Sequence, residues 1–535
     1  MKSSEDGNRG ENEMYGCPGC GGMMTFDIKS QQLKCGRCDR TESIGEADQR
    51  EARTAGSNFS VDVLTCPTCG AQIRAMNTAQ AAFCSYCGAS VMLEARSADM
   101  EAPETVAPFR VTREECFAKY QELVKKSLCA DRALKKDVTA DSFRGIYVPQ
   151  YVYSAAVKGE TVLEGTETHG NDTYYYNTTV SLDHEFEHIL HDASREMPDA
   201  MSEKIARVEP DAFKPFSPAY LSGYYADIPD TDEDAYIPFA KAEAVRLGLE
   251  DVMDDMKGNI HYSTGAAEKK LVKMAHAQCT GKTLIPVWFM SIRSKGRILY
   301  AIQNGVTGEM TADMPMDIPR FGLIALIAAI PLFFLFNNVL NLTLRPEMIL
   351  IVAMLLALGA QWIVNRRRRN IADKEAAEDA KDGADDLKTR LKQRKRMASH
   401  SKDGFANTAE TVGGFGGLIA LAILMTQFSK INDASVFKLG ALVLTALMGV
   451  QIWWGTKTGT KTPLGSIAAL IVMALGTVNL ILDPFHSDDL INYALAILCM
   501  AAVIWVCIEM LMIHNRECSN PMPQFESHTG GEGNA

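Results

Sequence analysis

Apolar runs long enough to cross a lipid bilayer fill much of the chain beyond residue 318. A membrane-spanning helix needs about 20 apolar residues, and each run reaches that length when its flanking residues are included. The pattern predicts an all-α polytopic membrane domain, with a transmembrane hairpin of two helices at 319–366 and four transmembrane helices at 412–514. The six predicted spans are Phe321–Phe336, Met348–Val364, Gly414–Phe428, Val436–Trp454, Leu464–Leu482 and Leu490–Ile513.

Shorter elements of two kinds occupy residues 106–318. Thr112 and Glu115 form a capping box that opens an amphipathic helix, and a second helix is expected over 232–256. Apolar and aromatic runs predict strands, and Asn304-Gly305 predicts a turn after the last of them. The predicted strands are Gly145–Tyr153, Thr173–Val180, Leu284–Met290 and Arg297–Gln303. The region is therefore expected to be a cytoplasmic α+β domain.

Eight of the 14 cysteines form two copies of the pattern C-x2-C-x14-C-x2-C, offset by 49 residues. Two CxxC pairs provide a closed tetrahedral site of four sulfurs, in which zinc is structural and has no open position. Each copy predicts a small β zinc ribbon, at 15–42 and at 63–93, and so we expect two structural Zn²⁺ ions. The predicted ligands are Cys17, Cys20, Cys35, Cys38, Cys66, Cys69, Cys84 and Cys87. No residue is assigned a catalytic role.

The segments between these regions are polar. We expect a disordered N-terminus at 1–14, linkers at 43–62 and 94–105, a charged cytoplasmic loop at 367–411 and a disordered tail at 515–535.

Charge indicates where the chain resides. The net charge of -12 argues against a dedicated nucleic-acid-binding protein, and the first residues lack the apolar core of a secretory signal. Arg366–Arg369 and the cluster 388–396 lie between the second and third spans, and Lys457 and Lys461 between the fourth and fifth. The positive-inside rule therefore predicts a multi-pass protein of the inner (plasma) membrane with both termini in the cytoplasm. A reducing cytoplasm also suits thiolates that bind metal.

The cysteine pattern resembles the zinc ribbon of transcription factor IIB, which also occurs in many bacterial proteins. Residues 15–320 are similar to a family of bacterial membrane proteins that combine such ribbons with an α+β domain. The motifs that carry this resemblance are Pro108–Thr112, Gly145–Pro149, Ser217–Ala226, Pro286–Trp288 and Asn304–Gly308. The resemblance implies the architecture of a ribbon-containing membrane protein, while the activity of that family is undefined.

His184-Glu185-Phe186-Glu187-His188 matches HExxH, the signature of zinc proteases. The chemistry requires a helix, which places both histidines on one face. On a strand, their Cα atoms would lie about 13 Å apart, at ~3.3 Å per residue. The local pattern fits both periods, and the polar β-rich segment upstream favours the strand. A membrane-linked metallopeptidase is therefore retained only as an alternative.

Two further motifs suggest nucleotide or nucleic-acid binding. Gly281-Lys282-Thr283 lacks the glycine-rich cradle of a P-loop, because His276 stands where the first glycine is needed. The first ribbon carries some basic residues, but a basic face with stacking aromatics is not evident in either ribbon. Binding of nucleic acid by the ribbons stays a second alternative.

Taken together, the patterns predict a non-enzymatic scaffold or sensor that recruits a cytoplasmic protein partner to the lipid bilayer. Polar residues such as Thr477, Asn479 and Glu509 are sparse within the predicted spans, which favours helices that anchor and pack over a transport pathway. The partner's identity and the oligomeric state are left open by the sequence.

Overall fold

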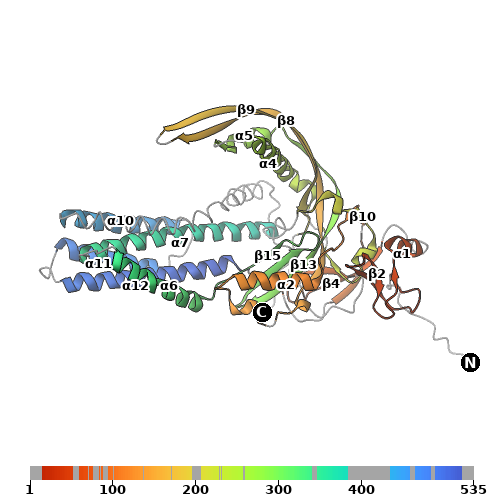
Figure 1. The fold of residues 1–535 in the computed structure, drawn as a ribbon, viewed down its shortest axis with the longest axis horizontal. Helices are drawn as coiled ribbons and strands as arrows, with labels where there is room; N and C mark the ends of the chain where they lie inside the picture. Colours follow the sequence, from red (N-terminus) through yellow and green to blue (C-terminus); the bar gives the residue numbers. More distant parts are fainter. Residues whose placement is uncertain are drawn as a thin grey trace, which may run out of the picture. The chain divides into compact units, whose positions relative to one another are not determined.

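The chain forms two compact units, each of which is described here by itself. The sheet unit comprises residues up to Lys126 together with Lys135–Asp313, and the helix unit comprises Ser127–Leu134 together with Met314–Asn520. This computed structural model describes residues 15–51, 59–69, 71–75, 84, 86–87, 94–100, 102–136, 138–169, 172–194, 207–227, 229, 232–256, 260–339, 346–383, 434–457, 464–482 and 489–520 (Figure 1).

A small three-stranded sheet holds the first group of cysteines. Strands β1 (Met24–Asp27) and β2 (Gln32–Cys35) form an antiparallel hairpin, and β3 (Thr41–Glu42) pairs with β2. Helix α1 (Ile44–Glu51) follows directly, and Ser43 and Glu46 close its start through mutual hydrogen bonds. The first ribbon is therefore a small sheet with a helix attached.

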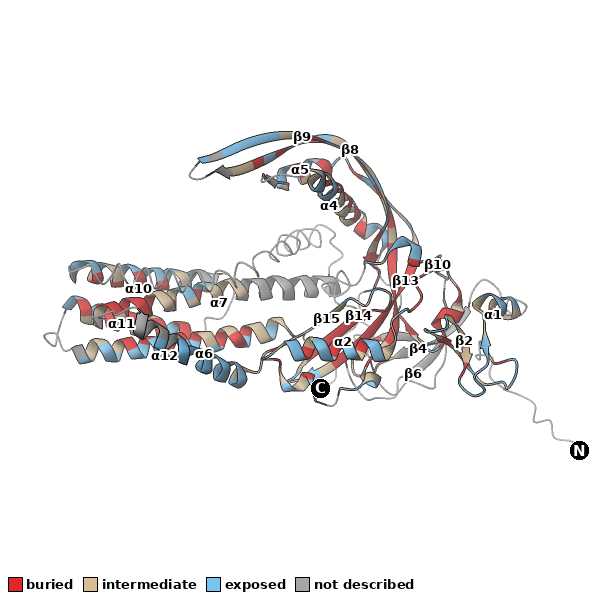
Figure 2. Cartoon of the chain, viewed as in Figure 1, coloured by how far each residue is buried: buried red, intermediate tan, exposed pale blue. Residues whose placement is uncertain are grey.

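The remaining strands form one 12-stranded sheet with the order β10-β7-β13-β8-β11-β5-β4-β6 along its main path. Off this path, β9 and β12 pair with β8, β14 pairs with β13, and β15 pairs with β14. The strands are β4 (Phe59–Thr65), β5 (Gln72–Ala75), β6 (Glu94–Met100), β7 (Thr105–Val106), β8 (Arg144–His169), β9 (Asp172–Asp192), β10 (Lys214–Pro215), β11 (Tyr225–Ala226), β12 (His261–Ser263), β13 (His276–Ser294), β14 (Arg297–Asn304) and β15 (Met310–Ala312). Figure 2 shows how strongly β13 and β14 are buried.

Strands β8 and β9 are 26 and 21 residues long, and β9 pairs along its whole length with the part of β8 from Gln150 to His169. They form an arm that curves over α4 (Ile237–Asp255) and α5 (Gly265–Leu271) (Figure 1). Gly248 allows α4 to approach this arm closely, because a Cβ there would lie 2.9 Å from Leu182. The apolar side of the arm is thereby buried.

Helix α2 (Arg113–Lys126) begins at the predicted capping box. The Thr112 hydroxyl and backbone N–H both donate to Glu115, at 2.9 and 2.8 Å, and the Glu115 N–H donates to the Thr112 hydroxyl at 3.3 Å. The capping box is confirmed, because it satisfies N–H groups that have no partner within the first helical turn.

The helix unit contains α6 (Ile318–Val339), α7 (Pro346–Gly383), α10 (Ala434–Lys457), α11 (Leu464–Leu482) and α12 (Asp489–Glu517). Among the described residues, four helical segments are long and apolar enough to span a membrane: Glu347–Arg368, Ser435–Trp453, Leu464–Leu482 and Leu490–Glu517. Helix α6 contains a shorter apolar segment, Ile318–Pro331. The predicted span Gly414–Phe428 lies outside the described residues.

Polar contacts define the helix directions. At one end of the bundle Asn365 of α7 donates to the Gln451 carbonyl of α10 (3.1 Å), and the N–H of Gly465 in α11 donates to Glu509 of α12 (3.1 Å). At the other end Asn479 of α11 donates to Asn492 of α12 (2.9 Å). Helices α7, α10 and α12 therefore run in one direction, and α11 runs in the opposite one.

The fold class predicted from the sequence is confirmed: two four-cysteine clusters in small β elements, a domain that mixes helices with a sheet, and long apolar helices. Several predicted boundaries differ. The second ribbon is not a separate sheet, since β4 and β5 belong to the 12-stranded sheet. The segments interpreted as linkers contain α1 and β6, helix α7 continues to Gly383 within the predicted loop, and α12 continues to Glu517. Residues 1–14 and 521–535 lie outside the described part.

Candidate metal centres

The first four-cysteine cluster, here called site 1, contains Cys17, Cys20, Cys35 and Cys38. Its sulfur atoms all lie within 4.8 Å of one another. The Cys17 and Cys38 sulfurs are 3.6 Å apart, and the Cys20 and Cys35 sulfurs are 3.5 Å apart. Zinc–sulfur bonds of ~2.3 Å in a tetrahedron give sulfur separations of roughly 3.8 Å. The four sulfurs thus fit a tetrahedral metal ion.

Each half of site 1 is a tight turn. The Cys17 N–H donates to the Gly22 carbonyl (2.7 Å), and the Gly21 N–H donates back to the Cys17 carbonyl (2.9 Å). Gly21 has a φ of 69°, which is the left-handed backbone expected after the second cysteine of the pair. In the other half Asp39 has the equivalent conformation, with a φ of 58°.

Backbone amides stabilise thiolates at site 1. The Arg37 N–H lies 3.4 Å from the Cys35 sulfur and holds the pKa of that thiol at about 6. The Gly19 N–H, at 3.4 Å from the Cys17 sulfur, likewise lowers the pKa of Cys17. An N–H group that donates a hydrogen bond to a thiolate stabilises the thiolate relative to the neutral thiol. Because metal binding requires thiolates, these amides prepare the site for a cation.

The second cluster, here called site 2, contains Cys66, Cys69, Cys84 and Cys87. Its sulfurs also lie within 4.8 Å of one another, with 3.7 Å between Cys66 and Cys87 and 3.8 Å between Cys69 and Cys84. The sulfur contact with Cys84, then that with Cys87 and burial, raise the pKa of Cys69 well above its usual value. Four buried sulfurs this close cannot all be anionic unless a cation balances them. Site 2 therefore has the donor set and the spacing of a metal site.

Side chains from distant parts of the sheet unit surround site 2. The Tyr86 hydroxyl donates to the carboxylate of Asp227 (2.9 Å), and Ser194 donates to the same oxygen (2.5 Å). Arg293 of β13 donates to the Cys87 carbonyl (2.6 Å) and to its sulfur (3.4 Å). Sequence reasoning missed Asp227 and Arg293, because nothing near them in the chain resembles a metal motif.

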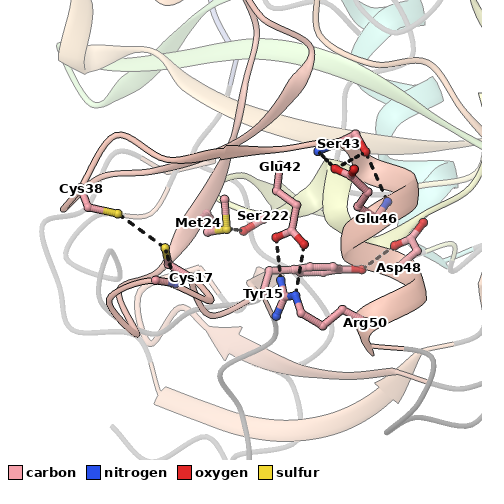
Figure 3. Close-up of polar contacts among 11 residues, drawn as sticks. Tyr15, Cys17, Met24, Cys38, Glu42, Ser43, Glu46, Asp48, Arg50 and Ser222 are labelled. Atoms are coloured by element: carbon pink, nitrogen blue, oxygen red, sulfur yellow. Dashed lines mark hydrogen bonds and ion pairs between the residues drawn. The ribbon is translucent and has the colours of Figure 1, made fainter.

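Figure 3 shows how site 1 and its ribbon contact α1 and Ser222. Tyr15 donates to Asp48 (3.0 Å), Arg50 forms an ion pair with Glu42 (2.9 Å), and the Ser222 hydroxyl donates to the Met24 carbonyl (2.6 Å). These contacts fix the first ribbon to its own helix and to the segment around Ser222.

The HExxH residues lie on strand β9 and not on a helix. His184 approaches Asp251 of α4 at 3.9 Å, whereas His188 sits at an irregularity of the strand, with a φ of 64°, and stacks on Phe213. Among the described residues, only the two cysteine clusters group three or more metal-binding side chains. The interpretation of this segment as a strand is confirmed, which removes the geometric basis for the peptidase.

Gly281-Lys282-Thr283 lies inside strand β13. The Lys282 N–H donates to the carboxylate of Glu104 (2.5 Å), and the Thr283 hydroxyl contacts that of Thr105 (2.9 Å). A P-loop would place a glycine-rich turn and a helix N-terminus here. The segment is therefore an ordinary part of strand β13, and the Lys282 N–H is occupied by Glu104 instead of being available to a phosphate.

The fold and the two clusters define a multidomain protein with two candidate metal centres and candidate membrane helices. Over 316 residues the chain is 24% identical to a protein of Bacillus subtilis (strain 168) described as "Uncharacterized protein YdjG", an alignment that covers 57% of this chain and 90% of that relative. No protein-family model matches the chain. No solved structure matches it either.

Proposed function

We propose that this chain is a polytopic membrane protein with two structural zinc ions, which recruits a cytoplasmic protein partner to the membrane. The observation that carries this proposal is the pair of four-sulfur clusters in a chain that also has four helices able to span a bilayer. A closed Cys₄ site supplies fold stability and leaves no position open for a substrate. The role that fits best is that of a scaffold or sensor.

Zinc is the metal proposed for both sites. Four thiolates with tetrahedral spacing favour zinc over the hard cations, which prefer oxygen ligands. The same residues also admit iron, and metal analysis distinguishes the two. All eight cysteines named above are proposed as ligands.

The orientation is supported by two kinds of residue at the same end of the helix bundle. Arg366–Arg369 and Lys457 mark the end that the positive-inside rule assigns to the cytoplasm. Trp362, Trp453 and Trp505 are each more than half exposed near that end, as expected for side chains at a lipid headgroup boundary. We therefore propose six spans, of which α6 and residues 414–428 supply two, with both termini in the cytoplasm.

The arm of β8 and β9 offers a surface for the partner. Three consecutive tyrosines near its far end are exposed: Tyr174 (51%), Tyr175 (81%) and Tyr176 (38%). Exposed tyrosines often anchor protein interfaces, because they bury a large area at little entropic cost.

Elemental analysis of the full-length protein tests the zinc proposal. We expect two equivalents of zinc in the wild-type protein and one equivalent after Cys38→Ser or Cys87→Ser. The matched control is Cys116→Ser, a buried cysteine outside both clusters. Zinc content that is unaffected by Cys38→Ser and Cys87→Ser, or absent from the wild-type protein, contradicts the proposal.

Affinity purification of the full-length protein in detergent tests the partner proposal. A variant with serine at Tyr174, Tyr175 and Tyr176 should lose the co-purifying protein while keeping both zinc ions. The control is Leu128→Ser, which changes another exposed apolar side chain. Equal recovery of the same proteins with all variants argues against recruitment through the arm. Salt-sensitive binding of DNA or RNA by the wild-type protein would instead favour the nucleic-acid alternative.

A further inference from the structure

The two metal centres differ in their exposure to solvent. At site 2 all four cysteines are at most 1% exposed. At site 1 Cys17 and Cys35 are buried, Cys20 is half-buried and Cys38 is exposed. A competing ligand can therefore reach the metal position of site 1 past Cys38 without any opening of the fold. At site 2 the surrounding sheet would first have to open.

The two centres also differ in what holds their ligands. Arg293 donates to both the carbonyl and the sulfur of Cys87, and a cation beside a metal-bound thiolate opposes its dissociation. Tyr86, between two ligands of site 2, is anchored to the buried Asp227. At site 1 the sulfurs of Cys17 and Cys35 accept from backbone N–H groups of their own turns. Site 2 is thus braced by the sheet, while site 1 is braced locally.

A single segment, residues 217–227, contacts both ribbons, and we call it the connector. On the side of site 1, Ser222 forms two hydrogen bonds with strand β1: its carbonyl accepts from the Phe26 N–H (2.9 Å), and its hydroxyl donates to the Met24 carbonyl (2.6 Å). Tyr220 also packs its ring edge-on against Phe26, at 5.3 Å between centroids. The connector therefore lies alongside strand β1. Strand β1 pairs with β2, which ends at the ligand Cys35.

On its other side the connector is part of the main sheet. Its strand β11 pairs in antiparallel fashion with β5 of the second ribbon and in parallel fashion with β8. The next residue, Asp227, accepts from Tyr86 and donates its own N–H to the Tyr147 carbonyl (2.8 Å). Residues 217–227 therefore link the first ribbon to the edge of site 2 by continuous chain.

We infer that site 1 is an exchangeable zinc site, that site 2 retains its zinc, and that loss of zinc from site 1 is transmitted to the sheet through the connector. This inference rests on the proposed function, since it assumes zinc at both sites. It makes the chain a sensor of available zinc, because the four cysteines of site 1 release Zn²⁺ to a stronger competing ligand and bind it again when that ligand is absent. By linkage, a connector that holds the first ribbon firmly also strengthens zinc binding at site 1.

Zinc release from the full-length, zinc-loaded protein in detergent tests the difference between the sites. After addition of the chromogenic chelator 4-(2-pyridylazo)resorcinol we expect a fast and a slow phase of one equivalent each. Cys38→Ser should remove the fast phase, and Cys87→Ser the slow one. Arg293→Ala should accelerate the slow phase about tenfold, as is usual for loss of a group that supports a metal ligand. The control Lys295→Ala, in the turn that follows β13, should leave both phases unchanged.

Hydrogen–deuterium exchange of the same protein tests the transmission. Withdrawal of one equivalent of zinc should increase exchange in peptides that cover 217–227, but not in β14. Gly223→Ala should in turn accelerate only the fast phase, because Gly223 has a φ of 91° and its Cβ would meet Thr25 at 3.0 Å. The control is Gly45→Ala, at a position with open space.

The outcomes separate this inference from the proposed function. A protein that purifies without zinc overturns both. Two zinc ions that leave at one rate, or a fast phase that disappears with Cys87→Ser, overturn only the assignment of site 1 as the exchangeable site. Unchanged exchange at 217–227 after release from site 1 overturns the transmission.

Discussion

Glycine 22 is placed where a side chain would collide with the sulfurs of site 1. A Cβ at this position would lie 3.3 Å from both the Cys20 and the Cys35 sulfur and 3.1 Å from the Cβ of Arg37. Gly36, in the opposite turn, has nothing within 4 Å of such a Cβ. Each of the two glycines lies within two residues of a cysteine of site 1, but only at Gly22 would an added Cβ crowd the sulfurs.

Gly22→Ala should therefore weaken zinc binding at site 1 about tenfold, because overpacking a tight site costs roughly 1–3 kcal/mol and ~1.4 kcal/mol is a factor of ten. Gly36→Ala is the matched control and should leave the affinity unchanged. Chelator competition with the full-length protein measures the difference. Equal affinities of the two variants would show that the sulfurs can move aside freely.

A second glycine supports the aromatic core of the sheet unit. Phe109 stacks on Tyr224 at 4.6 Å and packs against Tyr147 and Trp288 at 5.3 and 4.9 Å between ring centroids. Gly305, in the predicted Asn-Gly turn, faces this cluster, and its Cβ would lie 2.5 Å from the Phe109 ring and 3.0 Å from the Pro286 carbonyl. The turn motif thus has a packing role that its sequence alone does not reveal.

Gly305→Ala should lower the free energy of unfolding of the sheet unit by about 1–3 kcal/mol, the usual cost of forcing a methyl group into a packed core. Gly265→Ala, at the first residue of α5 where nothing lies within 4 Å, should have no such effect. Denaturant unfolding followed by tryptophan fluorescence is suitable, because Trp288 lies in the cluster. An unchanged midpoint for Gly305→Ala would contradict the close approach.

Among the secondary-structure elements, strand β9 excludes the metal-binding geometry that an HExxH motif has on a helix. The spacing of Phe186, Ile189 and Leu190 fits a helix as well as a strand, and the polar β-rich segment upstream favoured the strand. The long pairing of β9 with β8, across 19 registered residue pairs, fixes the segment as a strand. Tertiary pairing thus resolved what periodicity could not.

Replacing His184 or His188 by alanine should leave the zinc content at the wild-type value, because neither side chain belongs to a cluster of metal-binding groups. Glu185→Gln should likewise have no effect on zinc. Cys38→Ser, which is expected to remove one equivalent, serves as the positive control in the same metal analysis. Loss of zinc from either histidine variant would support the metallopeptidase hypothesis instead.

The second ribbon shows the same dependence on pairing. Its cysteine spacing equals that of the first ribbon, and both were predicted as separate modules. Yet β4 pairs with β6, and β5 pairs with the connector strand β11, so the second ribbon is continuous with the main sheet. Residues 94–100 are polar and were interpreted as a linker, because an edge strand with little apolar surface has no strong strand pattern.

In the whole molecule, the apolar runs predicted the positions of four helices that are long and apolar enough to span a membrane. Four of the six predicted spans coincide with helices of membrane-spanning length, and the end of α7 is the main difference. Hydropathy detects the apolar part of a helix but not its charged extension, and residues 367–383 of α7 were therefore predicted to belong to a loop.

Reporter fusions test the proposed orientation. Green fluorescent protein fused after Ala535 should fluoresce, whereas alkaline phosphatase at the same position should be inactive, since both termini are proposed to be cytoplasmic. Reporters inserted at 458–463 and at 483–488 should give opposite results, because these residues flank α11, which is proposed to cross the membrane. Active phosphatase at the C-terminus would place the arginine-rich end outside the cytoplasm.

The four-cysteine clusters, the capping box at Thr112 and the long apolar helices could be predicted from the sequence. Each of them depends on residues that lie close together along the chain, so that their spacing or hydropathy is enough to identify them. The pairing of distant segments shows that the second ribbon joins the main sheet and that residues 217–227 contact both ribbons, and it confirms the strand that the sequence favoured at HExxH. These features arise from pairing between segments that lie beyond any short window of sequence, such as Gln150 with Asp192, β5 with β11, and Phe26 with Ser222. Such pairing is selected by the total burial of the fold rather than by a local pattern.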